Sequence, residues 1–265
     1  RAGRRDGRRG RAMSAPVLPG LAGHLFVVTG AAGGQGAEEA LALARAGAEV
    51  IAVDLADEAP ALAGESAISY RRLDVASERD WEALAASLDG RRVRGLVNNA
   101  GITHRARIGD LAREDWDRVF AVNVTGAMLG IQALLPLMDA GSSIVNIGSV
   151  AGLTGHYTAA YTASKWALRG LTHASVTELG PRGIRVNLVH PGFIRTPMTA
   201  SAPDAFARAN TAIIPLHRVG EVDEVAGIVA FLLSDAAAFI TGAEIGVDGG
   251  QALSGAATVL ADALR

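Results

Sequence analysis

The strongest constraint on the fold is an alternation of short β-branched runs with longer stretches rich in alanine and leucine. The short runs predict strands at 25–30, 49–55, 68–75, 94–101, 142–150, 184–192 and 243–250. The longer stretches predict helices at 36–47, 77–90, 111–138, 158–179 and 221–234. Strands that are apolar on both faces and are joined by helices indicate a parallel sheet covered on both sides. The sequence therefore predicts a single-domain α/β fold of the doubly wound Rossmann type, with seven parallel strands and helices on both faces.

The amino-terminal segment differs in composition from the rest of the 265 residues. Its first twelve residues, RAGRRDGRRGRA, contain six arginines and no bulky apolar side chain. A mitochondrial presequence is also rich in arginine, but it needs an apolar helix face, which this segment lacks. We predict that residues 1–20 form a disordered leader and that residues 21–265 form the domain. The natural start is expected at Met13, with the residues before it read from upstream. A basic tail for an anionic partner is the alternative.

Composition argues against several kinds of function. A net charge of −2, with no basic cluster in the body of the chain, argues against nucleic-acid binding. No run of 18 apolar residues occurs, so no membrane span is predicted. The lack of cysteine excludes disulfides, thiolate catalysis and cysteine-ligated zinc, and it fits a reducing cytoplasm. No metal site is predicted.

A glycine-rich loop, TGAAGGQG at 29–36, follows the first predicted strand and opens the first helix. Gly30, Gly34 and Gly36 allow a tight turn and let backbone N–H groups approach a diphosphate. The start of the helix adds a partial positive charge. The loop therefore predicts a dinucleotide site, although many such loops contain glycine only in order to turn.

Asp54 ends the second predicted strand, about 20 residues after the loop. A carboxylate at this place can accept hydrogen bonds from both ribose hydroxyls of adenosine, and it would repel a 2′-phosphate. Neither Ala32 nor Gly33 supplies a basic side chain for such a phosphate. We therefore predict NAD(H) rather than NADP(H), with a surface aspartate at a strand end as the alternative.

Polar residues also end the next two predicted strands, in LDV at 73–75 and NNAG at 98–101. Ligands of doubly wound sheets bind at the carboxyl ends of the strands. Asp74 could contact the adenine amino group. Asn98 could brace neighbouring strands or contact the cofactor, and the sequence does not decide between these roles.

Tyr161 and Lys165 are four residues apart on a predicted helix, so their side chains share one face. A free tyrosine has a pKa of about 10, and a nearby ammonium lowers it by stabilising the phenolate. Tyr157 has Tyr161 rather than a cation at the corresponding position. Ser149 ends the fifth predicted strand, where its hydroxyl could hold a substrate oxygen. Taken alone, the tyrosine–lysine spacing is common on protein surfaces.

In combination, these motifs resemble the short-chain dehydrogenase/reductase family. The resemblance runs from about His24 to Gln251. It rests on TGAAGGQG, LDV, NNAG, VNVTG (122–126), IGS (147–149), YTASK (161–165) and HPGFIRTP (190–197), and on the segment 218–250. Within the family the sequence is most similar to bacterial NAD-dependent 3α(20β)-hydroxysteroid dehydrogenases.

The resemblance implies a role for each matching catalytic residue. Tyr161 is expected to be the general acid/base that protonates a carbonyl oxygen as hydride arrives, or deprotonates the alcohol in reverse. Lys165 is expected to lower the pKa of Tyr161 and to hold the nicotinamide ribose. Ser149 is expected to orient the substrate oxygen, and Asn123 to bind a water that connects Lys165 to solvent. A satisfied buried asparagine is the alternative for Asn123.

The loop, the strand ends and the resemblance together assign a set of cofactor-binding residues, with Thr196 near the carboxamide. The set is Gly30, Gly34, Gln35, Gly36, Asp54, Asp74, Val75, Asn99, Ala100, Gly101, Tyr161, Lys165, Pro191, Gly192, Ile194 and Thr196. Two features depart from the family pattern. Gln35 stands where an aliphatic residue is common, and the spacing from Ser149 to Tyr161 is about one residue short. The short spacing leaves Ser164 as a rival for the serine position.

The substrate side is expected to be apolar with a few polar tips, which suits a bulky apolar alcohol or ketone. The residues expected there are Thr103, His104, Leu153, His156, Tyr157, Phe193 and Met198. The segment 198–215 has no firm periodicity and is expected to form a lid. A 3-oxoacyl-carrier-protein reductase is the first alternative, for which HRAR at 104–107 offers a small basic patch. A dinucleotide-binding protein without turnover is the second. The resemblance also implies a homotetramer, for which Trp166 offers a contact if it does not pack inward.

Overall fold

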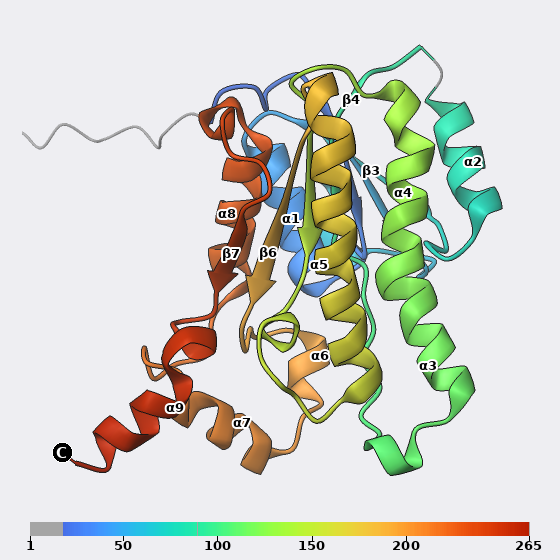
Figure 1. Cartoon of the computed structure of the whole chain (residues 1–265). Coiled ribbons are helices and arrows are strands. Elements are labelled where there is room, and N and C mark those ends of the chain that lie inside the picture. Colours follow the sequence, from blue (N-terminus) through green and yellow to red (C-terminus); the bar gives the residue numbers. More distant parts are fainter. Residues whose placement is uncertain (1–17, 89, 265) are drawn as a thin grey trace, which may run out of the picture.

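The computed structural model describes residues 18–88 and 90–264, and its centre is a seven-stranded parallel sheet (Figure 1). The strand order is β3-β2-β1-β4-β5-β6-β7, and every neighbouring pair is parallel. The predicted fold class is confirmed. The strands are β1 (Leu25–Thr29), β2 (Glu49–Asp54), β3 (Ile68–Arg72), β4 (Val93–Asn98), β5 (Ser143–Ile147), β6 (Arg185–Pro191) and β7 (Glu244–Val247).

Helices cover both faces of the sheet (Figure 1). On one face lie α1 (Gly34–Arg45) and α8 (Val222–Leu233), which pack against each other. On the other face lie α2 (Glu78–Ser87), α4 (Gly126–Leu134) and α5 (Ala159–Leu179). As predicted, a serine begins α2: the Ser77 hydroxyl accepts a hydrogen bond from the backbone N–H of Asp80.

The pleat of β1 divides its side chains between two hydrophobic cores. Phe26 and Val28 belong to the core beneath α1 and α8, whereas Leu25 and Val27 belong to the core on the opposite face. All four side chains are buried. A strand that is apolar at every position is therefore explained by a sheet with two covered faces.

The helix predicted at 111–138 is interrupted and shorter than expected. It consists of α3 (Arg113–Phe120), a π-helical turn (Ala121–Thr125) and α4, which ends at Leu134. Pro136 lies in a 3₁₀ turn beyond that end, because proline has no N–H to continue the α-helical hydrogen bonds. Such π turns inside helices are frequent at functional sites.

The combined helix Arg113–Leu137 is the one stretch in the described part of the chain that is long and apolar enough to cross a membrane. Its apolar residues have another use in the fold, since Leu129, Ile131 and Leu134 are buried in the core next to Trp81. Gly130 is small for the same reason: a Cβ there would lie 2.9 Å from the Trp81 ring. The composition of this helix is thus that of a core helix.

Three further helices lie beyond the carboxyl ends of the strands (Figure 1). The expected lid segment contains α6 (Pro197–Ala200) and α7 (Asp204–Ala212). After β7 the chain continues into α9 (Gln251–Asp262), which the sequence analysis did not predict. Its pattern was hard to detect because Leu253 and Leu260 are exposed by 93% and 70%.

The described chain is already packed on the domain at its first residues. Leu18 packs against the core, Leu21 is fully buried, and the Pro19 carbonyl accepts a hydrogen bond from Asp235 N at 2.8 Å. Residues 18–20 therefore belong to the packed structure, although they were assigned to the leader. The rest of the predicted leader, 1–17, lies outside the described residues.

Candidate active site

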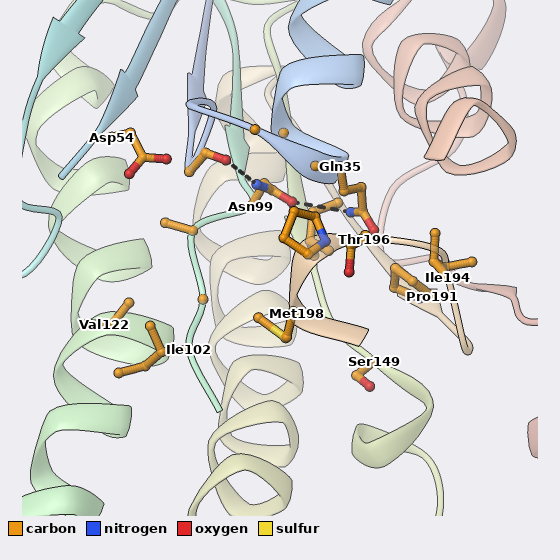
Figure 2. Close-up of a pocket in the computed structure, with 18 of the residues that line it drawn as sticks. Gln35, Asp54, Asn99, Ile102, Val122, Ser149, Pro191, Ile194, Thr196 and Met198 are labelled. Carbon is orange, nitrogen blue, oxygen red and sulfur yellow. Dashed lines mark hydrogen bonds between the residues drawn. The ribbon is translucent and has the colours of Figure 1, made fainter. Parts of the chain in front are cut away.

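An elongated cavity of about 480 Å³ lies at the carboxyl ends of the central strands. In Figure 2, Asp54 lies toward one end and Ser149 toward the other. Every residue assigned to cofactor binding from the sequence lines this cavity, as do Ser149 and Met198. The volume falls in the range of about 300–1,000 Å³ that is typical of small-molecule sites.

The glycine loop is shaped so that backbone, not side chains, faces the cavity. Gly30 and Gly34 have φ of +68° and +58°, a region that favours glycine. A Cβ on Gly36 would lie 2.3 Å from the Gly30 carbonyl oxygen, and one on Gly30 would lie 2.8 Å from Ala100 Cα. The glycines therefore bring backbone at the amino terminus of α1 to the cavity wall, which fits an anionic diphosphate.

Gln35, the residue that departs from the family pattern, belongs to a buried polar network. Its Nε2 donates to Glu39 Oε1 at 2.9 Å. It also donates to Asn99 Oδ1 at 3.2 Å (Figure 2). Asn99 Nδ2 in turn donates to the carbonyls of Thr29 and Gly30 at 2.9 and 3.1 Å. Burial raises the pKa of Glu39 from 4.5 to about 8, and the hydrogen bond from Gln35 lowers it in part. The network fixes the glycine loop through the carbonyls of Thr29 and Gly30. Glu39 was not identified from the sequence.

Backbone amides hold the Asp54 carboxylate at the end of β2. Its Oδ2 accepts from Ala32 N at 2.9 Å and its Oδ1 accepts from Ala56 N at 3.2 Å. The carboxylate is thus fixed at the end of the cavity away from Ser149. Asp74 also lines this end, and its Oδ1 accepts from Ala76 N at 2.9 Å.

Asn98 lies outside the cavity and braces the sheet. Its side chain is buried and donates to Asn146 Oδ1 at 2.8 Å, and Asn146 donates to Thr172 Oγ1 at 2.8 Å. Of the two roles that the sequence left open for Asn98, the structure supports the bracing of neighbouring strands.

Ser149 and Tyr161 meet at the other end of the cavity, and both also line a second, smaller cavity beside it. Ser149 caps the 3₁₀ turn Val150–Gly152, where its Oγ accepts from Ala151 N at 3.2 Å. The rival serine, Ser164, is fully buried, and its hydroxyl donates to the Tyr161 carbonyl at 2.7 Å. The geometry therefore favours Ser149 as the serine that can reach a substrate.

Burial shifts the pKa values of both Tyr161 and Lys165 toward their neutral forms. It raises the pKa of Tyr161 above 10.0, with a partial offset from the Ser149 hydroxyl. It lowers the pKa of Lys165 from 10.5 to about 8. Lys165 Nζ donates to the Ile147 carbonyl at 2.7 Å and lies 5.6 Å from the centre of the Tyr161 ring. Burial and the Ser149 hydrogen bond are the causes of the Tyr161 shift, so the lowering of its pKa by Lys165, expected from the spacing, stays a prediction.

Asn123 lies in the π-helical turn and is buried behind the cavity wall. Its Oδ1 accepts from Ile102 N at 2.8 Å, and its Nδ2 donates to Ile102 O at 3.0 Å and to Ser164 Oγ at 2.9 Å. A Cβ on Gly101 would lie 3.4 Å from Lys165 Nζ and 3.5 Å from Asn123 Oδ1. Asn123 therefore has protein partners, and Gly101 lies next to both Asn123 and Lys165.

A largely buried cluster centred on Glu244 supports the 3₁₀ turn that begins after Ser149, and no local sequence pattern marked it. Glu244 Oε2 lies 2.8 Å from Arg169 Nε and 3.2 Å from His190 Nε2. Arg169 also donates to the Gly152 carbonyl at 3.1 Å, and His190 Nδ1 lies 2.9 Å from the Ser149 carbonyl. The Glu244 carboxylate thus positions two side chains that contact backbone carbonyls at the two ends of this turn, Ser149 and Gly152.

The second cavity, called the substrate chamber here, has a volume of about 120 Å³. Its walls include an aromatic cluster in which the ring of Phe206 lies 6.0 Å from the rings of His156, Tyr157 and Phe193. Burial lowers the pKa of His156, which favours the neutral imidazole. Thr103 and Met198 line the chamber as expected.

Two residues expected on the substrate side have other surroundings. His104 lies 3.4 Å from Asp115, and neither His104 nor Leu153 is part of the described chamber wall. The chamber also has wall residues that sequence reasoning missed, among them Arg105, Phe206 and Gln251. Phe206 and Gln251 come from α7 and the start of α9, two helices that the sequence analysis did not predict.

The amino-acid sequence is similar to those of known proteins over most of its length. A family model described as enoyl-(acyl carrier protein) reductase matches residues 30–252. The chain is 40% identical to trans-4-hydroxycyclohexanecarboxylate dehydrogenase of Sinomonas cyclohexanicum, over 87% of this chain and 93% of that protein. It is 43% identical to 3-alpha-(or 20-beta)-hydroxysteroid dehydrogenase of Mycobacterium tuberculosis, over 87% and 90%. It is 39% identical to a 3-oxoacyl-[acyl-carrier-protein] reductase of Thermotoga maritima, over 87% and 98%.

These relatives are named for the interconversion of alcohols and ketones, and each is matched over most of its length. The chain is therefore an oxidoreductase that belongs to the short-chain dehydrogenase/reductase family.

Proposed function

We propose that the protein is an NAD(H)-dependent dehydrogenase that interconverts a secondary alcohol and a ketone, with Tyr161 as general acid/base. The observation that carries the proposal is one continuous cavity that joins the Asp54 carboxylate, the glycine loop and the Tyr161 phenol. A nicotinamide dinucleotide supplies or accepts the hydride when it is bound there.

The chain's own residues provide the proton chemistry. In the direction of reduction, the Ser149 hydroxyl and the Tyr161 phenol hold the carbonyl oxygen, and Tyr161 passes its proton to that oxygen. The raised pKa keeps this proton on Tyr161 until it is needed. Lys165 has three N–H donors, and Ile147 O takes one of them. The others remain for ribose hydroxyls and for a developing phenolate.

The choice of NAD(H) rests on Asp54. Its fixed carboxylate offers acceptors for ribose hydroxyls, and a 2′-phosphate placed beside it would meet a like charge. Neither of the nearby loop residues Ala32 and Gly33 carries a basic side chain that could compensate.

The substrate we propose is a cyclic secondary alcohol or the matching ketone. The aromatic cluster of the chamber suits an apolar ring, and two relatives are named for cyclic alcohols. The chamber of about 120 Å³ is below the range of about 300–1,000 Å³ for sites that hold drug-sized ligands. A compact ring is therefore the first candidate. A steroid is the second, and it requires displacement of the lid segment.

Two other functions make different predictions. A 3-oxoacyl-carrier-protein reductase is favoured by the basic residues Arg105 and Arg107 near the chamber and by one of the relatives. A dinucleotide-binding protein without turnover would have no need of both Tyr161 and Lys165, and this chain has both.

The test is an initial-rate comparison of NAD⁺ and NADP⁺ over cyclohexanols, steroid alcohols and, in the reverse direction, 3-oxoacyl thioesters. We expect strong NAD⁺ preference, and we expect the Tyr161→Phe variant to lose turnover while it still binds NADH. Asp54→Ala should reduce the preference, whereas Asp57→Ala, a matched change at an exposed residue nearby, should preserve it. NADP⁺ preference in the wild type would contradict the proposed role of Asp54 in selecting NAD⁺. Turnover restricted to 3-oxoacyl thioesters would contradict the proposed function and support a 3-oxoacyl-carrier-protein reductase.

We also propose a homotetramer. Trp166 is exposed by 47% on α5, stacked under the Arg169 guanidinium at 4.6 Å, so it points outward. Phe239 and Leu253 are further large apolar side chains that this protomer leaves exposed. Light scattering on the purified protein tests the assembly, and a monomer at micromolar concentration would contradict it.

A further inference from the structure

Arg105 is the one charged residue in the described wall of the substrate chamber. It reaches the chamber from the loop that follows β4. Its Nη2 donates to the Met198 carbonyl at 2.9 Å and its Nη1 donates to Ser201 Oγ at 3.2 Å. Both partners are neutral, so these hydrogen bonds orient the guanidinium without compensating its charge.

No carboxylate of the described residues forms an ion pair with Arg105, whereas nearby arginines have such partners. Arg113 pairs with Asp117 at 2.7 Å, and Arg118 pairs with Asp115 at 2.9 Å. Asp115, the carboxylate nearest in sequence that contacts this loop, takes His104 as well as Arg118. The positive charge at the chamber is therefore left unpaired while acids nearby are used elsewhere.

A second arginine adds to this charge. Arg107 lies with its guanidinium carbon 5.8 Å from the centre of the Tyr157 ring, and Tyr157 is a chamber residue. It too forms no ion pair with a carboxylate in the part of the chain that the structure describes. The described chamber wall thus carries the charge of Arg105, with a second positive charge beside Tyr157, and no acidic residue.

A guanidinium presents paired N–H donors that match the geometry of a carboxylate. Arg105 has five N–H donors, and its two neutral acceptors leave others free. We propose that the substrate bears a carboxylate, carried by a compact ring that also bears the reacting secondary alcohol, and that Arg105 binds this carboxylate. The inference rests on the proposed function, since Ser149 and Tyr161 in the same chamber must hold the reacting oxygen.

The test compares three alcohols of similar shape: 4-hydroxycyclohexanecarboxylate, its carboxamide and 4-methylcyclohexanol. The wild type should oxidise the carboxylate with a kcat/KM about 10- to 100-fold above the neutral pair, which is the range expected for a hydrogen-bonded charge. Arg105→Gln should abolish this preference, mainly through KM, and leave the neutral alcohols within a few-fold. Arg113→Gln, which removes an ion-paired arginine a few residues along the chain, should keep the preference.

A binding measurement separates the inference from the proposed function. Cyclohexanecarboxylate should bind the enzyme in the presence of NADH more tightly than cyclohexanecarboxamide, and Arg105→Gln should remove the difference in calorimetry. The inference is wrong if the wild type oxidises neutral and anionic alcohols equally, or if Arg105→Gln slows both equally. In that case Arg105 only holds the lid segment, and the proposed dehydrogenase function is unaffected. If no alcohol is oxidised but the carboxylate still binds through Arg105, the proposed function fails and the anion site stands. Turnover only of carrier-protein thioesters, without binding of cyclohexanecarboxylate, overturns both.

Discussion

Replacement of Glu39 by glutamine should remove a pH-dependent loss of stability. Glu39 is 1% exposed in α1, and only its Oε1 has a partner among the described residues, the amide of Gln35. An ionised carboxylate there would leave a buried charge with an unpartnered Oε2. Burial accordingly raises the pKa of Glu39 from 4.5 to about 8, so the folded protein carries a neutral acid at neutral pH.

The direction of the effect follows from the two pKa values. Between pH 4.5 and 8 the unfolded chain releases a proton that the folded chain keeps, so the stability contributed by the neutral acid falls as the pH rises through this window. From about pH 5.5 to about pH 8.5 the loss amounts to about 3 kcal/mol at 1.36 kcal/mol per pH unit. For a domain of this size it corresponds to a decrease in Tm of about 6–12 °C.

The assay is chemical denaturation of wild type and Glu39→Gln at both pH values, with the change in stability compared between the two proteins. Other titrating groups are common to both and cancel in this comparison. Glu38→Gln is the control, because Glu38 is the adjacent residue and pairs with Arg45 at the surface. Parallel pH profiles for wild type and Glu39→Gln would show that Glu39 is ionised in the fold, and would refute the reasoning.

Three further predictions concern the site. Gly36→Ala should weaken NADH binding by about 1–3 kcal/mol in a fluorescence titration, because its Cβ would collide with the Gly30 carbonyl; unchanged affinity would mean that the loop adjusts. Glu244→Gln should lower kcat about tenfold with unchanged NADH affinity, because the supports of the Ser149 turn lose their shared partner; a loss of NADH affinity instead would contradict this positioning role. Lys165→Met should lower kcat by about 100-fold or more. In the wild type, activity that needs the Lys165 ammonium should fall as the pH rises through about 8, and a flat profile there would be inconsistent with its pKa.

The lining of the larger cavity could be predicted from the sequence because its determinants are local. A parallel sheet brings the residues after each strand to one edge, so the motifs after β1, β2, β3 and β4 converge once the fold is known. Positive φ at Gly30 and close contact at Gly36 explain why glycine is required at these positions. The sequence carries this information in residue types at fixed positions.

The walls of the smaller cavity could not be predicted to the same depth, because their determinants are distant contacts. Phe206 reaches the chamber from α7, whose position depends on packing beyond the strand ends rather than on periodicity. Glu244 contacts Arg169 on α5 and His190 on β6, which come together only in the folded chain. Charge partners separated by more than fifty residues leave no pattern in the sequence.

The tyrosine–lysine pair shows where reasoning from spacing needs the fold. The i and i+4 relation correctly places Lys165 beside Tyr161, but it says nothing about the dielectric environment of either group. Burial shifts the pKa of both groups toward the neutral form. The free protein therefore holds a protonated phenol beside an amine with a pKa of about 8, an arrangement ready to donate a proton to a carbonyl. Oxidation of an alcohol needs the phenolate instead, so it should depend more steeply on pH than reduction does, and the two directions of the same reaction should have different optimal pH values.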